Sequence, residues 1–204
     1  MSTQASLQSP PSKSLAQWQD LFSKIDLLSH YRLRKQHIAQ VGFPIVTLEV
    51  LRALTVFLRG RKVLDVGAGT GYLARLLSDR HINIRAVDNF TGVYEGANWE
   101  QHLYFDVEKV NALTLPELSD PQTVIIMSWP PYEDPFAYQV AQAMSAGQFL
   151  IYQGVWRGCT GDEDFHTLLE TQFHRLESPA LQEGHINFQG IFDTWTIFCK
   201  KPSP

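Results

Sequence analysis

Short apolar runs rich in β-branched residues alternate along this chain with segments whose apolar residues recur every three or four positions. The first pattern predicts buried strands and the second predicts amphipathic helices. Strands are expected at residues 63–66, 82–88, 103–106, 123–127 and 149–152. Helices are expected after the first strand and at residues 136–146 and 165–173. This alternation is typical of an α/β protein whose sheet is largely parallel.

The last part of the chain adds two further apolar runs, at about residues 175–181 and 186–200. A turn near Glu183 and Gly184 separates them, so they are expected to form a closing antiparallel hairpin. With the five earlier strands they predict a seven-stranded sheet that is covered by helices on both faces.

The first 13 residues are polar and proline-bearing, and they are expected to form a disordered tail. Ser14 and Gln17 then match a capping box, which predicts the start of a helix. Apolar residues on one face of this helix predict that it packs on the domain: Leu15, Trp18, Phe22, Ile25 and Leu28.

The segment at residues 30–40 is charged and less regular, and Gly42 ends it. Pro44 suits the first position of a further helix, whose apolar residues continue to Leu58. The chain is therefore expected to consist of a tail at 1–13, an N-terminal helical extension at 14–43 and one domain at 44–204.

Three glycines at alternate positions, Gly67, Gly69 and Gly71, follow the first strand. Glycine lets the backbone turn sharply and lets a ligand approach without a Cβ in the way. Asp65 lies at the carboxyl end of the strand, where open α/β sheets bind their ligands. A dinucleotide fingerprint would need its third glycine at position 72, which is Tyr72. A nicotinamide cofactor and a glycine turn without any ligand remain as alternatives.

This G-x-G-x-G string after an apolar strand resembles the first motif of class I S-adenosylmethionine-dependent methyltransferases. The resemblance implies a Rossmann-like seven-stranded methyltransferase sheet over residues 44–204 and S-adenosylmethionine as the cofactor. It also implies that the strand end and the turn contact the cofactor, through Asp65, Gly67, Ala68, Gly69 and Gly71.

Two further positions would contact the nucleoside in such a fold. Asp88 ends the second predicted strand, where an acid can accept hydrogen bonds from both ribose hydroxyls, and Asn89 follows it. The alternative is that Asp88 and Asn89 are turn residues at a strand end. Asp106 and Val107 stand where the family commonly holds the adenine ring.

The strand at 123–127 is followed by Ser128, Trp129, Pro130, Pro131 and Tyr132. This string is similar to the Asp/Asn-Pro-Pro-Tyr/Phe motif of amino-group methyltransferases, and it implies that Ser128, Trp129, Pro130 and Tyr132 are the catalytic positions. In that motif, oxygen atoms accept the hydrogens of the amine and an aromatic ring closes the site. Small methyltransferase-like proteins with a Trp-Pro-Pro-Tyr element are similar too, but they suggest no substrate.

The string departs from the motif at Trp129, because an indole donates one hydrogen bond and accepts none. Ser128 could supply an acceptor instead, and the prolines are expected to leave the carbonyl groups of Trp129 and Pro130 available. Methylation of an amine is therefore permitted by the sequence but not implied. The alternative is a rigid loop that only covers the cofactor.

Residues 154–164 combine glycines, an aromatic residue and acids ahead of a helix, and they are expected to form a mobile lid. Asp162 is better explained as the cap of that helix than as a catalytic acid. No base stands beside Cys159 in the sequence, which argues against a nucleophilic cysteine.

The charge is distributed unevenly. The chain has 204 residues, 44% of them hydrophobic, and a formal net charge of −4, which excludes a generally basic nucleic-acid binder. Residues 1–62 nevertheless carry nine Lys or Arg against three Asp or Glu. The densest basic segment contains His30, Arg32, Arg34, Lys35 and His37. A solvated helix face explains it better than nucleic acid, which stays possible but not favoured.

The remaining signals exclude several kinds of site. The two cysteines lack metal-ligand spacing, and the seven histidines show no H-x-x-x-H arrangement, so no metal is expected. The sequence contains no secretory signal and no apolar run long enough for a membrane span, which favours a cytoplasmic protein without membrane contact.

The sequence thus predicts an S-adenosylmethionine-dependent methyltransferase. Its acceptor would be a small molecule or a protein, with an amine nitrogen as one option. A direct transfer needs alignment more than a catalytic triad. Two alternatives stay open: a non-catalytic cofactor-binding or interaction module with the same fold, and an NAD(P)-dependent oxidoreductase.

Overall fold

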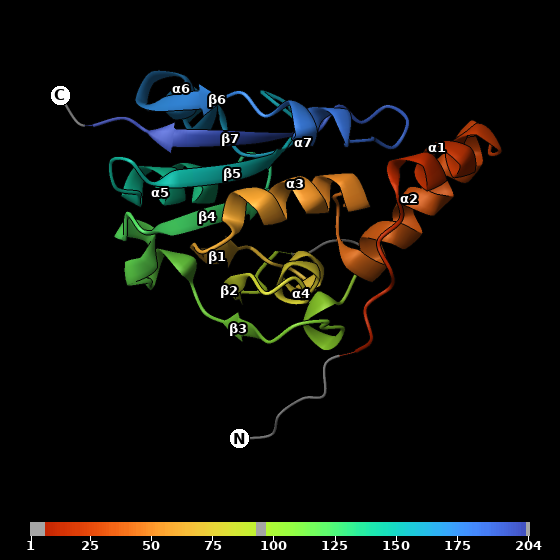
Figure 1. The fold of residues 1–204 in the computed structure, drawn as a ribbon, viewed down its shortest axis with the longest axis horizontal. Helices are drawn as coiled ribbons and strands as arrows, with labels where there is room; N and C mark the ends of the chain where they lie inside the picture. Colours follow the sequence, from red (N-terminus) through yellow and green to blue (C-terminus); the bar gives the residue numbers. More distant parts are fainter. Residues whose placement is uncertain (1–6, 93–96, 203–204) are drawn as a thin grey trace.

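The computed structural model describes residues 7–92 and 97–202 and contains a seven-stranded sheet in the order β3-β2-β1-β4-β5-β7-β6 (Figure 1). Strands β1 to β5 run parallel, and β7 runs antiparallel to both β5 and β6. The strands span Lys62–Val66 (β1), Asn83–Asp88 (β2), Val107–Lys109 (β3), Thr123–Ser128 (β4), Phe149–Gly154 (β5), Phe173–Leu176 (β6) and Thr194–Lys200 (β7). The predicted seven-stranded α/β sheet is confirmed.

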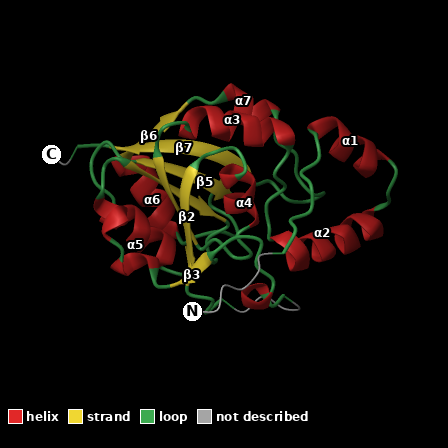
Figure 2. Cartoon of the chain, turned by 60° about the horizontal axis from the view of Figure 1, so that its bottom comes forward, coloured by secondary structure: helices red, strands yellow, loops and turns green. Residues whose placement is uncertain are grey.

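Helices cover both faces of this sheet (Figure 2). Helices α3, α4 and α7 pack on one face, and α5 and α6 pack on the other. The helices span Leu15–Ser23 (α1), Leu27–Val41 (α2), Leu48–Leu58 (α3), Tyr72–Ser78 (α4), Phe136–Ala143 (α5), Glu163–Gln172 (α6) and Pro179–Glu183 (α7).

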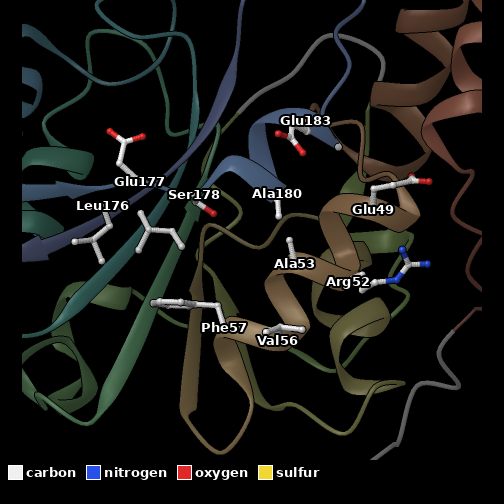
Figure 3. A pocket seen from close by; sticks show the side chains of 12 residues that line it. Glu49, Arg52, Ala53, Val56, Phe57, Leu176, Glu177, Ser178, Ala180 and Glu183 are labelled. Carbon is white, nitrogen blue, oxygen red and sulfur yellow. The ribbon is translucent and has the colours of Figure 1, made fainter.

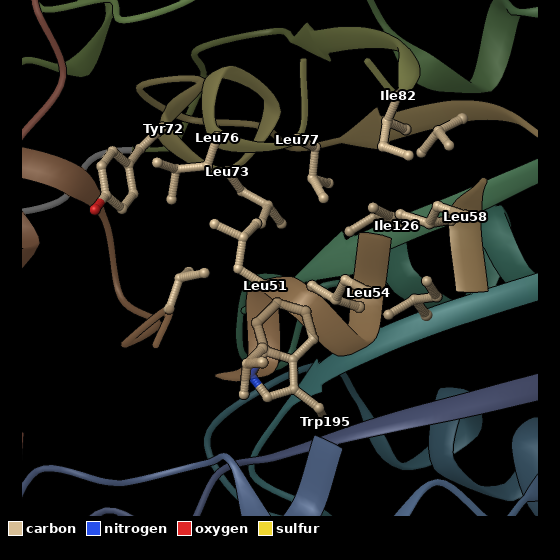
Figure 4. Close-up of a cluster of buried hydrophobic side chains, with 14 of the residues drawn as sticks. Leu51, Leu54, Leu58, Tyr72, Leu73, Leu76, Leu77, Ile82, Ile126 and Trp195 are labelled. Carbon is tan, nitrogen blue, oxygen red and sulfur yellow. The ribbon is translucent and has the colours of Figure 1, made fainter. Parts of the chain in front are cut away.

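Neighbouring residues of the central strands enter two different cores, because side chains alternate across a strand. Val124 and Ile126 of β4 pack under α3 and α4, in the cluster that Figure 4 shows around Leu54 and Trp195. Ile125 and Met127 pack on the opposite face with α5 and α6. A parallel strand covered on both faces must be apolar along its whole length, which explains the continuous apolar run at 123–127.

Parallel strands place their carboxyl ends at one edge of the sheet. Helices α1 and α2 lie beyond this edge, next to the start of α3 (Figure 1). Strand β7 begins at the same edge, since Gly154 at the end of β5 pairs with Thr194 at the start of β7. Segments far apart in the sequence therefore meet where the β1 and β4 loops emerge.

The N-terminal extension is more regular than its sequence predicts. Ser14 and Gln17 form the predicted capping box, but α1 ends at Ser23 and does not reach Leu28. Asp26 caps a second helix through the backbone N–H of Ser29, and this helix continues without interruption through the charged segment at 30–40. A side-chain cap and the burial of one face outweigh the weak apolar pattern there.

Two of the expected elements differ in the structure. Pro44 is not helical, because Thr47 caps α3 by accepting from the N–H of Val50. Residues 103–106 are not a strand; Tyr104 donates its backbone N–H to Thr70 and packs on Tyr72, so its apolar neighbours mark contact with α4 and not a place in the sheet.

The predicted hairpin also differs in its connection. Strands β6 and β7 do pair antiparallel, but α7 takes up residues 179–181 of the run expected as the first strand, and β7 begins at Thr194 and not near residue 186. Pro179 at the first helical turn and the burial of Leu181 against α3 favour a short helix there.

Residues 7–13 have no helix or strand but are attached to the domain. The N–H of Leu7 donates to Leu103, Ser12 Oγ donates to the carbonyl of Val46, and the carbonyl of Lys13 accepts from Leu48. These contacts disagree with the expected disorder at 7–13, while the part of that prediction on residues 1–6 lies outside the described residues. Among the described helices, none is long and apolar enough to cross a membrane.

Candidate functional site

The turn between β1 and α4 has the backbone that its glycines predict. Gly67, Gly69 and Gly71 have φ angles of 69°, 54° and 69°, in the left-handed region that side chains with a Cβ rarely adopt. A Cβ on Gly71 would lie 2.7 Å from Cγ2 of Val107 and 2.9 Å from Cβ of Phe105. The third glycine therefore lets the turn pack against the start of β3.

Asp88 at the end of β2 holds this turn from the side. Its Oδ2 accepts the N–H of Gly69 at 2.8 Å, and its Oδ1 accepts the N–H of Phe90 at 2.7 Å. Asp88 therefore does act as a turn residue at the end of a strand, as the alternative interpretation expected. Each carboxylate oxygen retains a second lone pair, so contact with a ligand hydroxyl is still possible.

The other predicted cofactor positions divide into two groups. Gly67, Ala68 and Val107 lie in or beside the turn. Asn89 and Asp106 are exposed, and Oδ1 of Asn89 accepts from the backbone and the hydroxyl of Thr91.

Asp65 is buried beneath the turn. Burial, together with the negative charge of Asp88, raises the pKa of Asp65 to about 7. A carboxyl with this pKa carries a proton in a large fraction of molecules at neutral pH.

The loop after β4 is attached to the loop after β5. The N–H of Gly161 donates to the carbonyls of Pro130 and Pro131, at 3.3 and 3.1 Å, and the N–H of Glu133 donates to the carbonyl of Gly161. The expectation that the carbonyls of Trp129 and Pro130 stay available is wrong for Pro130, whose carbonyl accepts from Gly161. Tyr132 lies at the surface with 58% of its area exposed.

Trp129 has a φ of 51°, which is unusual for a bulky residue. Its Nε1 donates to Oδ2 of Asp193 at 2.8 Å, and the same oxygen accepts from Nε2 of Gln153 at 2.5 Å. Oε1 of Gln153 accepts the hydroxyl hydrogen of Ser128 at 3.0 Å. His185 contacts the other oxygen of Asp193 at 3.1 Å. We call Ser128, Trp129, Gln153, His185 and Asp193 the carboxyl-edge network.

The N-terminal extension joins the network to the glycine turn through aromatic rings. The ring of Phe43 stacks on Trp129 with centroids 4.8 Å apart and meets the edge of Trp99 at 5.7 Å. The indole of Trp99 lies over Gly69, 3.4 Å from where a Cβ would be, and donates to the carbonyl of Ile38. The hydroxyl of Thr70 donates to the carbonyl of Val41.

The basic segment at 30–37 does not form one charged surface. His30 is buried. The pKa of His37 falls to about 4, mainly because His37 is itself removed from solvent, and the charge of Lys13 adds to the shift. Arg32 and Lys35 are exposed, whereas Arg34 lies over the ring of Trp129 at 5.9 Å. One cation of the segment therefore faces the candidate site and two face solvent.

The loop at 154–164 is held by several hydrogen bonds. Oγ1 of Thr160 contacts the hydroxyl of Tyr152 at 2.6 Å and accepts the N–H of Val155. Asp162 caps α6 through the N–H of Phe165, as predicted. Cys159 is exposed, and the mobility expected of this loop stays a prediction.

An open groove of about 550 Å³ lies on the outer side of α3 (Figure 3). Its lining comes from α3 and from residues 176–184 and 197, with Ala53, Val56 and Phe57 on one side and Ala180 on the other. It is therefore separate from the glycine turn and from the loop after β4.

Sequence reasoning missed Gln153, His185 and Asp193, and it missed the contacts of Phe43 and Trp99. The sequence contains no usable signal for Asp193, because it lies inside the run at 186–200 that is expected as a strand. In the structure it directly precedes β7, which begins at the carboxyl edge. Within residues 7–92 and 97–202, no three His, Cys, Asp or Glu side chains gather into a potential metal site.

No protein-family model matches the chain, and no curated protein matches it either. Several solved structures are similar to it. Cofactor-bound Rv0187 from MTB superposes with a TM-score of 0.50 at 16% identity, over 96% of this chain and 100% of that one. Magnesium protoporphyrin IX methyltransferase (ChlM) from Synechocystis PCC 6803, with bound SAM, gives 0.50 at 13% identity, over 88% and 99%.

The chain has the class I methyltransferase fold. In this methyltransferase fold the glycine turn stands at β1 and the Ser128–Tyr132 loop at β4, both at the carboxyl edge. The superpositions establish the fold. At identities of 13% and 16% the likeness does not extend to substrate or activity.

Proposed function

We propose that the protein binds S-adenosylmethionine and transfers its methyl group to an acceptor at the loop after β4. The observation that carries this proposal is the glycine turn with Asp88 against it: three left-handed glycines and a carboxylate at the carboxyl edge of the sheet. That combination provides backbone without Cβ atoms and an acceptor for hydroxyl groups, which fits the amino-acid and ribose parts of such a cofactor.

The residues around the turn have distinct tasks in this proposal. Asp88 accepts hydrogen bonds from the ribose hydroxyls, and the side of the turn near Val107 holds the adenine ring. The indole of Trp99 beside Gly69 adds an aromatic surface on which a purine can stack. The bound cofactor supplies a methyl group that its sulfonium already activates, so the protein has mainly to align and desolvate the reactants.

The acceptor site is proposed at Ser128, Trp129, Pro130 and Tyr132. The indole N–H of Trp129 is directed to Asp193 and its ring stacks on Phe43, so Trp129 would contribute a fixed aromatic wall and not a hydrogen bond to an acceptor. A small molecule or a protein side chain, with an amine as one option, is compatible with this loop.

Calorimetry with S-adenosylmethionine and, separately, with NADH tests the cofactor. We expect binding of the first and none of the second; the opposite result would support the oxidoreductase alternative. Asp88→Ala should weaken S-adenosylmethionine binding by about 1.5–3 kcal/mol, as for a lost hydrogen bond to a charged group. Asp20→Ala is the control, because Asp20 is an exposed carboxylate of α1 away from the turn, and equal losses in both variants would remove the ribose role from Asp88.

A non-catalytic member of the same fold is the second candidate, and Trp129 at the Asp/Asn position favours it. Turnover of the cofactor to S-adenosylhomocysteine in the presence of extract fractions separates the two. Binding without turnover in any fraction would make the interaction module the better proposal.

A further inference from the structure

Arg34 is the cation of α2 that faces the proposed acceptor loop. Its guanidinium carbon lies 5.9 Å from the centre of the Trp129 ring, and its side chain is half-buried. Trp129 is the second residue of that loop, and the bond from its indole N–H to Asp193 holds it in place. The positive charge of Arg34 therefore lies directly beside the acceptor loop.

Arg34 forms no ion pair with any carboxylate within residues 7–92 and 97–202. Two other half-buried arginines do form such pairs: Arg75 pairs with Asp79, and Arg85 pairs with two glutamates. A guanidinium has five N–H donors in a planar fork, and contact with the face of a ring leaves these donors without an acceptor oxygen. The fork of Arg34 is therefore available for a ligand.

The carboxylates at this edge of the sheet already have other partners. Asp193 accepts from three side chains of the carboxyl-edge network, and Asp88 accepts two backbone N–H groups. Asp134 accepts a backbone N–H at the start of α5, and Glu133 raises the pKa of Tyr132 through a hydrogen bond to its hydroxyl. Because a charge that is partly removed from water is costly without a counterion, this position favours an anionic ligand.

We propose that Arg34 binds a carboxylate group of the methyl acceptor, so that the acceptor is a small molecule with one carboxylate. This inference rests on the proposed function, whose acceptor it specifies. The planar fork of a guanidinium matches the two oxygens of a carboxylate. One guanidinium balances one negative charge, which favours a carboxylate over a doubly charged phosphate.

The surroundings of Arg34 fit such an acceptor. Phe43 stacks on Trp129, and Tyr132 stands three residues further along the same loop with most of its area exposed. Aromatic surface beside one cation suits a ligand with a flat apolar body and a carboxylate. The cofactor of the proposed function brings a positive sulfonium to the same edge, so a negative acceptor adds attraction where a cationic one would add repulsion.

Binding of benzoate tests the site without methyl transfer. The full chain, saturated with S-adenosylhomocysteine, would be titrated in a calorimeter with benzoate, benzamide and benzylamine, which share a ring and differ in charge. We expect benzoate to bind roughly 10- to 100-fold more tightly than benzamide, as for hydrogen bonds to a charged group, and benzylamine to bind least. Equal affinities, tighter binding of phenyl phosphate, or no binding of benzoate at tens of millimolar would overturn the proposal.

Substitutions of two arginines on the same helix test the residue. Arg34→Gln keeps hydrogen-bonding groups but removes the charge, so the preference for benzoate over benzamide should disappear. Arg34→Lys keeps the charge without the fork and should retain part of the preference. Arg32→Gln is the matched control, because Arg32 is exposed, and it should keep the whole preference. A preference that survives Arg34→Gln, or that Arg32→Gln loses equally, would contradict the proposal.

The indole N–H signals in nitrogen NMR locate the ligand. Benzoate should shift the signal of Trp129 and leave the signal of Trp156, which packs against His166 and Phe198, unchanged. A shift of the Trp156 signal alone would place benzoate elsewhere and overturn the proposal.

The two forms of the cofactor link the site to methyl transfer. Benzoate should bind more tightly with S-adenosylmethionine than with S-adenosylhomocysteine, because only the first has a positive sulfonium. Equal affinities would separate the carboxylate from the transferred methyl group and overturn the proposal. Failure of both forms to bind would refute the proposed function itself. Titration of the unliganded chain then still decides the site: a preference for benzoate that depends on Arg34 supports it, and the lack of one overturns it.

Discussion

The glycine turn and the carboxyl-edge network lie at the same edge of the sheet but are assembled in different ways. The turn consists of residues 65–71 and one partner, Asp88, at the end of the next strand. The network draws its residues from the ends of β4 and β5 and from the segment before β7. The first is local in the sequence and the second is brought together only by the sheet.

The difference shows in how each region is stabilised. The turn depends on glycine conformation, and one hydrogen bond from Gly69 attaches it to Asp88. The network depends on one buried carboxylate that satisfies three donors from separate segments. A change in the turn should therefore affect ligand binding first, whereas a change in the network should affect the fold first.

The largest effect is expected for Gly69→Val. A β-branched side chain is strained at a φ of 54°, and its Cβ would contact the ring of Trp99 at 3.4 Å. Calorimetry should show S-adenosylmethionine binding weakened by at least about 100-fold, or more than 2.7 kcal/mol, while circular dichroism shows an intact sheet. Gly92→Val is the control, because Gly92 has an ordinary φ and open space around it. Normal binding by Gly69→Val would show that the turn is only structural.

Asp193→Asn should give the next largest effect, this time on stability. An amide nitrogen would face the N–H donors of Trp129, Gln153 or His185, so one donor stays buried without an acceptor. We expect a loss of about 2–3 kcal/mol in the free energy of unfolding, measured by urea denaturation. Asp79→Asn alters an exposed pair with Arg75 and should change stability very little. Equal losses in the two variants would contradict the central place given to Asp193.

A smaller effect is expected from the protonation of Asp65. Its pKa in the folded state, about 7, lies above the ordinary value of 3.8, so folding takes up a proton between these values. The stabilising contribution of the protonated group is full below pH 3.8 and is lost as the pH rises through 7. Between pH 5.5 and 7 the wild type should lose about 1.5 kcal/mol relative to Asp65→Asn, which lacks this titration. Parallel stability profiles for the two proteins would show that Asp65 is ionised in the fold.

The smallest effect on stability is expected for Tyr132→Ala. The ring is largely exposed, and the contacts that hold its loop come from the backbone of residues 130–133. The urea midpoint and the affinity for S-adenosylmethionine should therefore stay unchanged, while methyl transfer falls by about 100-fold if the ring aligns the acceptor. Trp129→Ala is the contrast, since it removes the stack on Phe43 and should lower the midpoint. A loss of cofactor affinity in Tyr132→Ala would move the ring to the cofactor pocket.

The features that depend on neighbouring residues could be predicted from the sequence. Apolar periodicity located the central strands, the alternating glycines located the turn, and Ser14 and Asp162 marked helix starts that the structure confirms. Each of these signals arises from backbone conformation or from side chains within a few positions. Such local preferences do not need the rest of the chain to be known.

The remaining features depend on contacts between distant segments of the chain. The apolar residues at 103–106 could be buried either in a sheet or against a helix. In the structure they pack beside the glycine turn and α4, because Tyr104 bonds to Thr70 and Phe105 lies against Gly71. The sequence around Trp129 shows an indole where an acceptor is expected, and it contains no sign that a carboxylate 64 residues later receives the indole N–H. A hydrogen bond between distant residues has no periodicity and no spacing, because its geometry exists only once the strands have set their order and direction.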